Sequence, residues 1–99
     1  MKQPCVYMLA NRKHGVIYIG VSSNLIKRVW QHKNNVVKSF TQKYHVHDLV
    51  WHEVHQEMAS AISREKKLKK WRRDWKIQLI EKTNPDWLDL YPDLISDSR

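Results

Sequence analysis

The sequence predicts an α+β domain in which helices flank a three-stranded antiparallel sheet, in the order β-β-α-β-α-α. Two short apolar runs, at residues 5–10 and 16–20, are separated by a polar turn that ends in Gly15. A third run of this kind spans residues 47–54. The segments that follow these runs repeat apolar residues every three or four positions, which is typical of amphipathic helices.

Length and composition predict a single domain, 1–99. A chain of 99 residues is long enough for one hydrophobic core. We expect this core at about residues 4–84, followed by an acidic, tryptophan-containing segment at 85–99. Cys5 is the only cysteine, and the sequence has neither a signal peptide nor a run of about 18 apolar residues. These features predict a soluble protein of the reducing cytoplasm.

The composition is strongly basic. Eighteen Lys and Arg residues against ten Asp and Glu give a formal net charge of +8 and a pI near 9.8. This excess favours a polyanionic partner, most simply nucleic acid. A membrane surface is disfavoured, because the chain has no lipidation signal and no long cationic helix with a clean apolar face. Basic charge that serves solubility alone is the alternative.

The first two strands form a predicted hairpin that leads into a helix. Cross-strand neighbours lie about 5 Å apart, so Tyr7 and Tyr18 can share one face of the sheet, or else be ordinary core tyrosines. Asn24 favours a helix N-cap and starts a helix over residues 24–33.

This helix carries two residues suited to phosphate chemistry. Arg28 and His32 lie four positions apart, so their side chains leave one face of the helix about a turn apart. Tyr18, at the end of the preceding strand, can point at the same face. A phenol, a guanidinium and an imidazole that converge at a strand-to-helix junction suit phosphate chemistry better than a hydrophobic core.

Residues 34–45 are polar with scattered apolar positions, and their pattern leaves both a short helix and a structured loop open. Histidines cluster just beyond, between residues 45 and 55. Their spacing does not match a helical His-x-x-x-His pair, and His47 and His52 fall on opposite faces of a strand. We therefore expect surface histidines here.

Residues 57–71 predict a helix whose apolar stripe is interrupted. Glu65 lies four positions after Ala61 and three before Leu68, where a core helix favours an aliphatic residue. An inward carboxylate is costly unless it is paired or binds a cation. Glu65 is thus a partner in an ion pair, a residue at the edge of the stripe, or a cation ligand. Basic residues surround it and form a rim suited to phosphate (Arg64, Lys66, Lys67, Lys69 and Lys70).

A last helix is predicted over residues 72–82, either separate from 57–71 or continuous with it through a bend. Trp75, Leu79 and Ile80 are its expected inward residues, and Asn84-Pro85 ends it. Residues 86–99 then carry apolar side chains suited to docking (Trp87, Leu88, Leu90 and Tyr91).

The order of these elements and a set of spaced residues resemble the GIY-YIG nuclease domain. Tyr18-Ile19-Gly20 keeps the second half of the family's motif, whereas Cys5-Val6-Tyr7 keeps only the tyrosine of the first half. Arg28 follows ten residues after Tyr18 and His32 four later, the spacing of the family's arginine and its His or Tyr. Glu65 matches the single metal-binding glutamate. The resemblance extends from about residue 4 to 91 and is strongest to small stand-alone bacterial members.

This resemblance implies a metal-dependent endonuclease that hydrolyses phosphodiester bonds in DNA, with structure-specific cleavage and a role in repair or recombination as further implications. Glu65 would hold one divalent ion, Mg²⁺ or Mn²⁺, with water and a phosphate oxygen completing its shell. Arg28 would bind the non-bridging phosphate oxygens. Tyr7 or Tyr18 would take the proton of the attacking water, and His32 would hold the tyrosine hydroxyl or relay its proton.

The nucleic acid would be bound by basic residues that follow its backbone (Lys27, Lys33, Lys66, Lys67, Lys69, Lys70, Arg72 and Arg73). Exposed Trp or Tyr residues would stack on unpaired bases. Asn84 is the candidate for the late asparagine of many family members, since no other asparagine follows Glu65. We expect a monomer, with a weak dimer as the alternative.

Two other classes of function stay open. The chain can be a nucleic-acid-binding module that keeps the fold without catalysis, which the incomplete first half-motif favours. It can also be an adaptor that binds a partner through the apolar C-terminal residues. Salt-sensitive DNA binding without cleavage would indicate the module, and a salt-insensitive complex the adaptor. A further hypothesis has residues 86–99 cover the basic rim and inhibit the site.

Overall fold

The computed structural model describes residues 3–36 and 40–97. Within these ranges it contains three strands, β1 (Cys5–Ala10), β2 (Ile17–Ser22) and β3 (Asp48–Val54). Its helices are α1 (Leu25–Lys33), α2 (Phe40–Tyr44), α3 (Met58–Lys70), α4 (Arg73–Thr83) and α5 (Tyr91–Asp97). The predicted α+β class and antiparallel sheet are confirmed. Two short helices, α2 and α5, add to the predicted order, and part of the undecided segment 34–45 lies outside the described residues.

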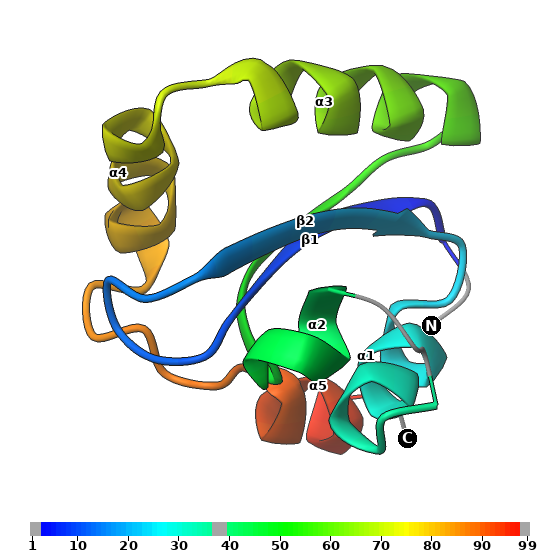
Figure 1. Ribbon diagram of the computed structural model, residues 1–99. Coiled ribbons are helices and arrows are strands. Elements are labelled where there is room, and N and C mark those ends of the chain that lie inside the picture. The colour runs from blue at the N-terminus through cyan, green and yellow to red at the C-terminus, as the bar shows by residue number, and fades with distance from the viewer. Residues whose placement is uncertain (1–2, 37–39, 98–99) are drawn as a thin grey trace.

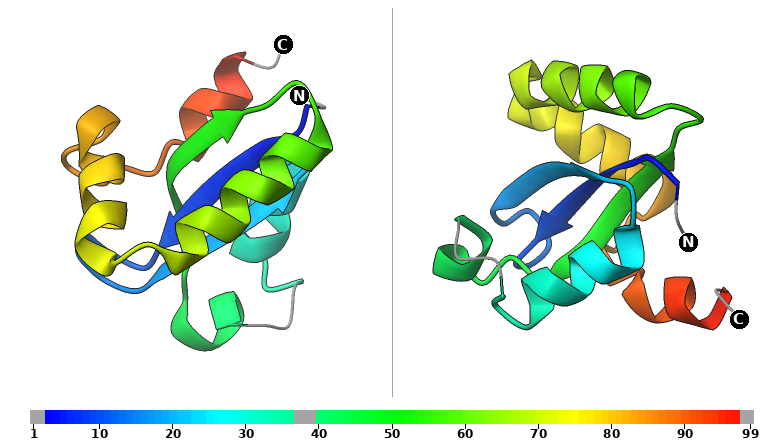
Figure 2. Two further views of the ribbon diagram at one scale, coloured as in Figure 1. Left: turned by 90° about the horizontal axis from the view of Figure 1, so that it is seen from above. Right: turned by 90° about the vertical axis from the view of Figure 1, so that its right-hand side faces the viewer.

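β1 is the central strand of a sheet with the order β2-β1-β3, and it pairs antiparallel with both neighbours. All its side chains are buried. Successive side chains point to opposite faces, so Met8 packs toward α3 and α4, whereas Tyr7 packs toward α1 and the C-terminal segment. Figures 1 and 2 show α3 on one side of the sheet and α1 with α5 on the other.

α3 and α4 are separate helices, because Trp71 and Arg72 between them adopt extended backbone with ψ of 150° and 153°. This break resets the helical phase. The expectation that Trp75 faces inward is wrong: it lies about 140° around α4 from the buried Ile80 and is 44% exposed. The predicted end of this helix is confirmed at Thr83, with Asn84 as the C-cap.

The C-terminal segment packs on the chain itself. Trp87 is 4% exposed, and Leu90, Tyr91 and Leu94 pack with the cluster around Tyr7, so the core continues beyond residue 84. The predicted docking residues are therefore largely used within the domain. α5 lies beside α1 and across the sheet from α3 (Figure 1), so the segment, as far as residue 97, does not cover the basic rim of α3.

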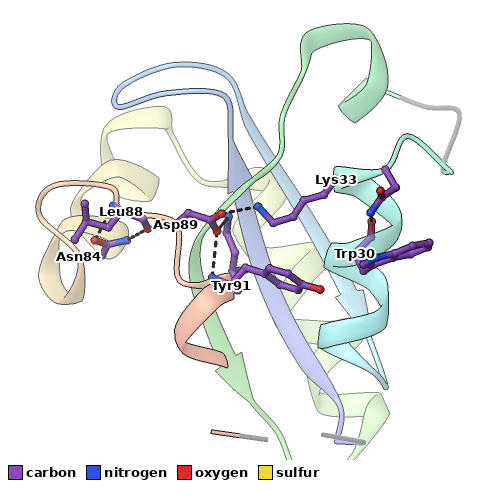
Figure 3. A network of polar contacts seen from close by, with 8 residues as sticks. Trp30, Lys33, Asn84, Leu88, Asp89 and Tyr91 are labelled. Atoms are coloured by element: carbon purple, nitrogen blue, oxygen red, sulfur yellow. Dashed lines mark hydrogen bonds and ion pairs between the residues drawn. The ribbon is translucent and has the colours of Figure 1, made fainter. Parts of the chain in front are cut away.

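One side chain and one backbone group fasten this segment. The Asp89 carboxylate accepts hydrogen bonds from the backbone N–H groups of Leu49 and Tyr91, at 3.0 and 3.1 Å, and pairs with Lys33 at 2.5 Å (Figure 3). The Leu90 N–H donates to the Leu49 carbonyl at 2.7 Å. The segment therefore satisfies backbone groups on β3. Among the described residues, no helix is long and apolar enough to cross a membrane.

Candidate active site

The register of the β1–β2 hairpin brings two tyrosines together. Tyr7 pairs with Gly20 and Leu9 with Tyr18, so the two tyrosines are diagonal neighbours on one face. Their ring centroids are 6.3 Å apart. A Cβ atom on Gly20 would lie 2.5 Å from both Cζ and Oη of Tyr7. The glycine of Tyr-Ile-Gly is therefore needed because the Tyr7 phenol lies directly over its backbone.

α1 delivers a histidine to the same face. The helix begins after Asn24, whose side chain accepts a hydrogen bond from the Lys27 N–H, as the sequence predicts. Two turns later, the His32 ring is fully buried, with its centroid 5.9 Å from that of Tyr7 and 5.3 Å from that of Tyr18. His32 Nε2 lies 3.0 Å from the Tyr7 hydroxyl, and Nδ1 lies 2.9 Å from Oγ1 of Thr41.

Burial keeps this pair neutral. Burial raises the pKa of Tyr7, and the neighbouring Tyr18 raises it further, while the Arg28 guanidinium opposes the rise. Burial also lowers the pKa of His32 to about 4, helped by the positive charge of Arg28. A neutral phenol donates to a neutral imidazole, so we assign the proton of the short contact to Tyr7. His32 Nδ1 then carries a hydrogen and donates to Thr41.

Arg28 lines a cavity next to this cluster. Its guanidinium donates to the Gln31 side chain at 3.3 Å and is half-buried. The cavity has a volume of about 670 Å³ and lies where β2 ends and α1 begins, with Met58 of α3 on its rim. Two cations face it, Lys27 and Arg28. Polar groups and positive charge at a concave surface suit a phosphate ester.

Glu65 lies along the open edge of β2. Met58, at the start of α3, borders the cavity at the end of β2, whereas Lys69, near the end of α3, borders a cavity of about 330 Å³ at Tyr18. α3 therefore runs antiparallel to β2. Residues 58, 65 and 69 are spaced by seven and four, which places them on one helix face. Glu65 is thus on the face that follows β2, between the two cavities.

The Glu65 side chain is 14% exposed, and its carboxylate lies 3.3 Å from Lys69 Nζ. This contact satisfies the inward carboxylate by an ion pair, one of the three alternatives that the sequence left open. Lys69 therefore forms an ion pair with Glu65 and also lines the cavity at Tyr18.

The donor set fits only one kind of metal site. The described part of the chain contains no group of three or more His, Cys, Asp or Glu residues that could hold a metal ion. Within these described residues, a metal ion could therefore not be coordinated by protein side chains alone. Mg²⁺ instead keeps several waters and binds through one or two carboxylates together with substrate phosphates. Glu65, which already attracts the ammonium of Lys69, fits an ion of that kind.

The basic residues divide into two groups. Lys27 borders the Arg28 cavity, and Lys66, Lys67 and Lys70 are exposed on α3. In contrast, Lys33 pairs with Asp89 and lies 5.2 Å from the Tyr91 ring centroid. Arg73 donates to the carbonyls of His14 and Gly15, at 2.7 and 2.6 Å, and so fastens α4 to the β1–β2 turn. Lys33 and Arg73 therefore have structural partners that the sequence did not indicate.

Asn84 also has a structural role. Its side-chain amide donates to the carbonyls of Val50 and Leu88 and accepts from the Leu88 N–H, at 2.8–3.1 Å. These bonds hold it against β3, at the opposite edge of the sheet from β2. The structure therefore does not bring Asn84 to Tyr7 and Tyr18; its contact with Leu88 is drawn in Figure 3.

Two supporting residues were missed from the sequence. Gln31 orients Arg28 from one turn further along α1, a spacing that could have indicated it. Thr41 holds His32 from α2, and nothing in the sequence pattern singles it out.

Two tyrosines, a neutral histidine and an arginine beside a cationic cavity define a domain equipped for chemistry on phosphate esters. A family model described as the GIY-YIG catalytic domain matches residues 3–78. The chain therefore belongs to the GIY-YIG family, a nuclease family whose members generally depend on a divalent metal ion. The domain is accordingly of nuclease type, with nucleic acid as the implied substrate.

The fold has a counterpart among solved structures. The chain is similar to the solution NMR structure of the UPF0213 protein BH0048 from Bacillus halodurans, with a TM-score of 0.52 and 23% sequence identity. The match covers 83% of this chain and 86% of that one. No protein of curated function matches the sequence.

Proposed function

We propose that this protein is an endonuclease that hydrolyses phosphodiester bonds in DNA, dependent on one divalent ion, Mg²⁺ or Mn²⁺. The observation that carries the proposal is the continuity of the site along β2. The Tyr7–Tyr18–His32 cluster lies beside this strand, the Arg28 cavity lies at its end, and Glu65 follows its open edge. We also propose a monomer of the cytoplasm that acts in DNA repair or recombination.

Arg28 is the proposed phosphate ligand. Its planar guanidinium can contact two non-bridging oxygens at once, which a lysine cannot do. Its position on the cavity wall, with Lys27 beside it, supports this role. Glu65 would hold the divalent ion, which supplies stabilisation of phosphate charge and a lower pKa of bound water.

Tyr18 is the proposed proton acceptor. The attacking water must reach the phenol from the substrate side, and Tyr18 is half-buried and borders a cavity, whereas Tyr7 is fully buried. Tyr7 would act as a positioning residue, held by His32 and packed against Tyr18 and Gly20.

A nucleic-acid-binding module without catalysis is the second candidate. Cys5 and Val6 stand where the family motif has Gly and Ile, and both side chains are fully buried. The Glu65–Lys69 pair also gives Glu65 a structural explanation that needs no metal. The complete Tyr18, Arg28 and His32 set favours the enzyme.

The deciding experiment is cleavage of labelled single-stranded, duplex and branched DNA with Mg²⁺ or Mn²⁺. We expect Glu65→Gln and Arg28→Ala each to lower cleavage by at least about 100-fold, while DNA binding of Glu65→Gln is retained. Glu57→Gln, an exposed carboxylate just before α3, is the matched control and should cleave like the wild type. If the wild-type protein binds DNA but cleaves none of these substrates, the proposal of an endonuclease is overturned and the binding module is established.

A further inference from the structure

An aromatic groove lies on α4, outside the cluster described above. It has a volume of about 340 Å³ and is lined by Trp71, just before the helix, and by one face of α4 (Trp75, Gln78, Leu79 and Lys82). Trp75 is 44% exposed and Trp71 is half-buried. Trp71 packs partly against the core, to which α4 also contributes Ile80, Ile77 and Leu79, whereas the exposed ring of Trp75 is not among the core residues.

Guanidinium groups cover both rings. The Trp71 and Trp75 centroids are 6.0 Å apart with an interplanar angle of 89°. The Arg64 guanidinium lies 5.3 Å from the Trp71 centroid, and that of Arg72 lies 4.6 Å from the Trp75 centroid. Rings and guanidinium planes are the two surfaces on which nucleobases stack in proteins that bind single strands. A purely apolar partner would gain little from these charges.

A basic path joins the groove to Tyr18. Lys76 follows Trp75 directly in the chain, and its ammonium donates to the Lys69 carbonyl at 3.5 Å. Both lysines border the cavity of about 330 Å³ that also contains Tyr18. Positive charge therefore extends from the edge of the tyrosine cluster to the aromatic groove, as a phosphate backbone requires.

We propose that Trp71 and Trp75 form a stacking site for an unpaired base of a DNA strand, whose phosphates follow Lys69 and Lys76 to Tyr18. This inference rests on the proposed function and specifies its substrate class. The preferred substrate is DNA that has a single-stranded segment next to the cleaved bond, and a fully paired duplex cannot use the groove.

The test is equilibrium binding in EDTA, where no metal supports cleavage. The probes are an unstructured oligodeoxynucleotide of about 15 nucleotides, within the site sizes of single-strand binders, and the same sequence as a duplex. We expect Trp75→Ala to weaken single-strand binding about tenfold or more and to change duplex binding less than about twofold. Trp75→Phe, which keeps an aromatic face, should restore part of the affinity.

Trp30→Ala is the matched control, because Trp30 is also an exposed tryptophan, at 50%, but lies on α1. It should bind both probes like the wild type, and thermal unfolding should show that Trp75→Ala is folded. Unchanged single-strand affinity, an equal loss on both probes, or a wild-type dimer that Trp75→Ala converts to monomer would each overturn the proposal. This test measures binding and not cleavage. Its result can therefore be interpreted even if the protein proves not to be a nuclease.

Discussion

The Tyr7 hydroxyl lies 3.0 Å from Nε2 of His32, and both side chains are fully buried. This bond links the central strand to α1 beneath the candidate site. Burial raises the pKa of Tyr7 and lowers that of His32 to about 4, so both side chains are neutral in the folded protein near pH 7. The pair therefore makes the stability of the fold depend on pH.

Stability should fall as the pH drops from about 6.5, the ordinary pKa of histidine, toward 4. A histidine with a lowered folded pKa binds its proton more readily in the unfolded chain. Its contribution is complete above the unfolded pKa and is lost as the pH falls through this window. The shift corresponds to about 3 kcal/mol in the free energy of unfolding.

Denaturant unfolding at pH 7.5 and 4.5 measures this effect, and the His32→Gln variant is the control that should show less of it. Proton NMR of the His32 ring gives an independent reading. A titration midpoint at pH 6 or above would contradict the prediction.

The two tyrosines should separate stability from activity. Tyr7→Phe leaves the buried Nε2 of His32 without its donor and should cost about 1–3 kcal/mol. Tyr18→Phe removes a half-buried hydroxyl and should cost less, yet lower cleavage by at least about 100-fold under the proposed mechanism. Chemical unfolding and DNA cleavage, measured on both variants, make the comparison. A Tyr18→Phe variant as active as the wild type would remove Tyr18 as the proton acceptor.

Gly20→Ala should destabilise the fold and disturb the site together. The new methyl group would lie 2.5 Å from the Tyr7 hydroxyl oxygen, and Tyr7 is too buried to move freely. We expect a loss of about 1–3 kcal/mol, typical of overpacking, and a shifted His32 ring resonance. Ser23→Ala, an exposed change three residues away, should leave both unchanged. Equal stability of the two variants would show that the sheet adapts to the methyl group.

Asp89→Ala should release the C-terminal segment. It removes the acceptor of the Leu49 N–H, a buried residue, at a cost of about 1–3 kcal/mol. Asp89→Asn keeps Oδ1 for that N–H but places an NH2 group opposite Lys33, so it loses the ion pair and its hydrogen bond. It should cost less than the Ala variant, which loses both contacts. Hydrogen exchange of the Leu49 and Leu90 amides reports the release directly. If Asn is as damaging as Ala, the ion pair and not the backbone contact dominates.

Local signals predicted most of the regular structure. The apolar run of β1, the Asn24 cap of α1 and the break at Asn84 are each encoded within a few residues, and each is found where predicted. α2 and α5 are five and seven residues long. Helices this short are not stable by propensity and form because tertiary contacts hold them. The sequence pattern therefore left α2 as one of two alternatives and did not indicate α5.

Two contacts within the candidate site were expected, a shared face for Tyr7 and Tyr18 and, from the family resemblance, a histidine that holds a tyrosine hydroxyl, and both are present. The pattern of residues did not indicate which tyrosine His32 would contact. Tyr7 and His32 are 25 residues apart, so their hydrogen bond depends on the packing of α1 against β1. Lys33 and Arg73 carry the charge that phosphate binding requires, yet their partners, Asp89 and the carbonyls of the β1–β2 turn, come from distant segments. Charge alone does not distinguish a residue that binds DNA from one that fastens the fold.

The attachment of Asp89 and Leu90 to Leu49 has a consequence for the behaviour of many copies in solution. A strand edge with unpaired N–H and C=O groups is a template for pairing with another molecule. The segment occupies these groups at Leu49, on the outer side of β3. If the C-terminal segment detached, the backbone N–H and C=O groups of Leu49 would lose their partners. Concentrated protein would then associate through strand pairing between molecules at this edge.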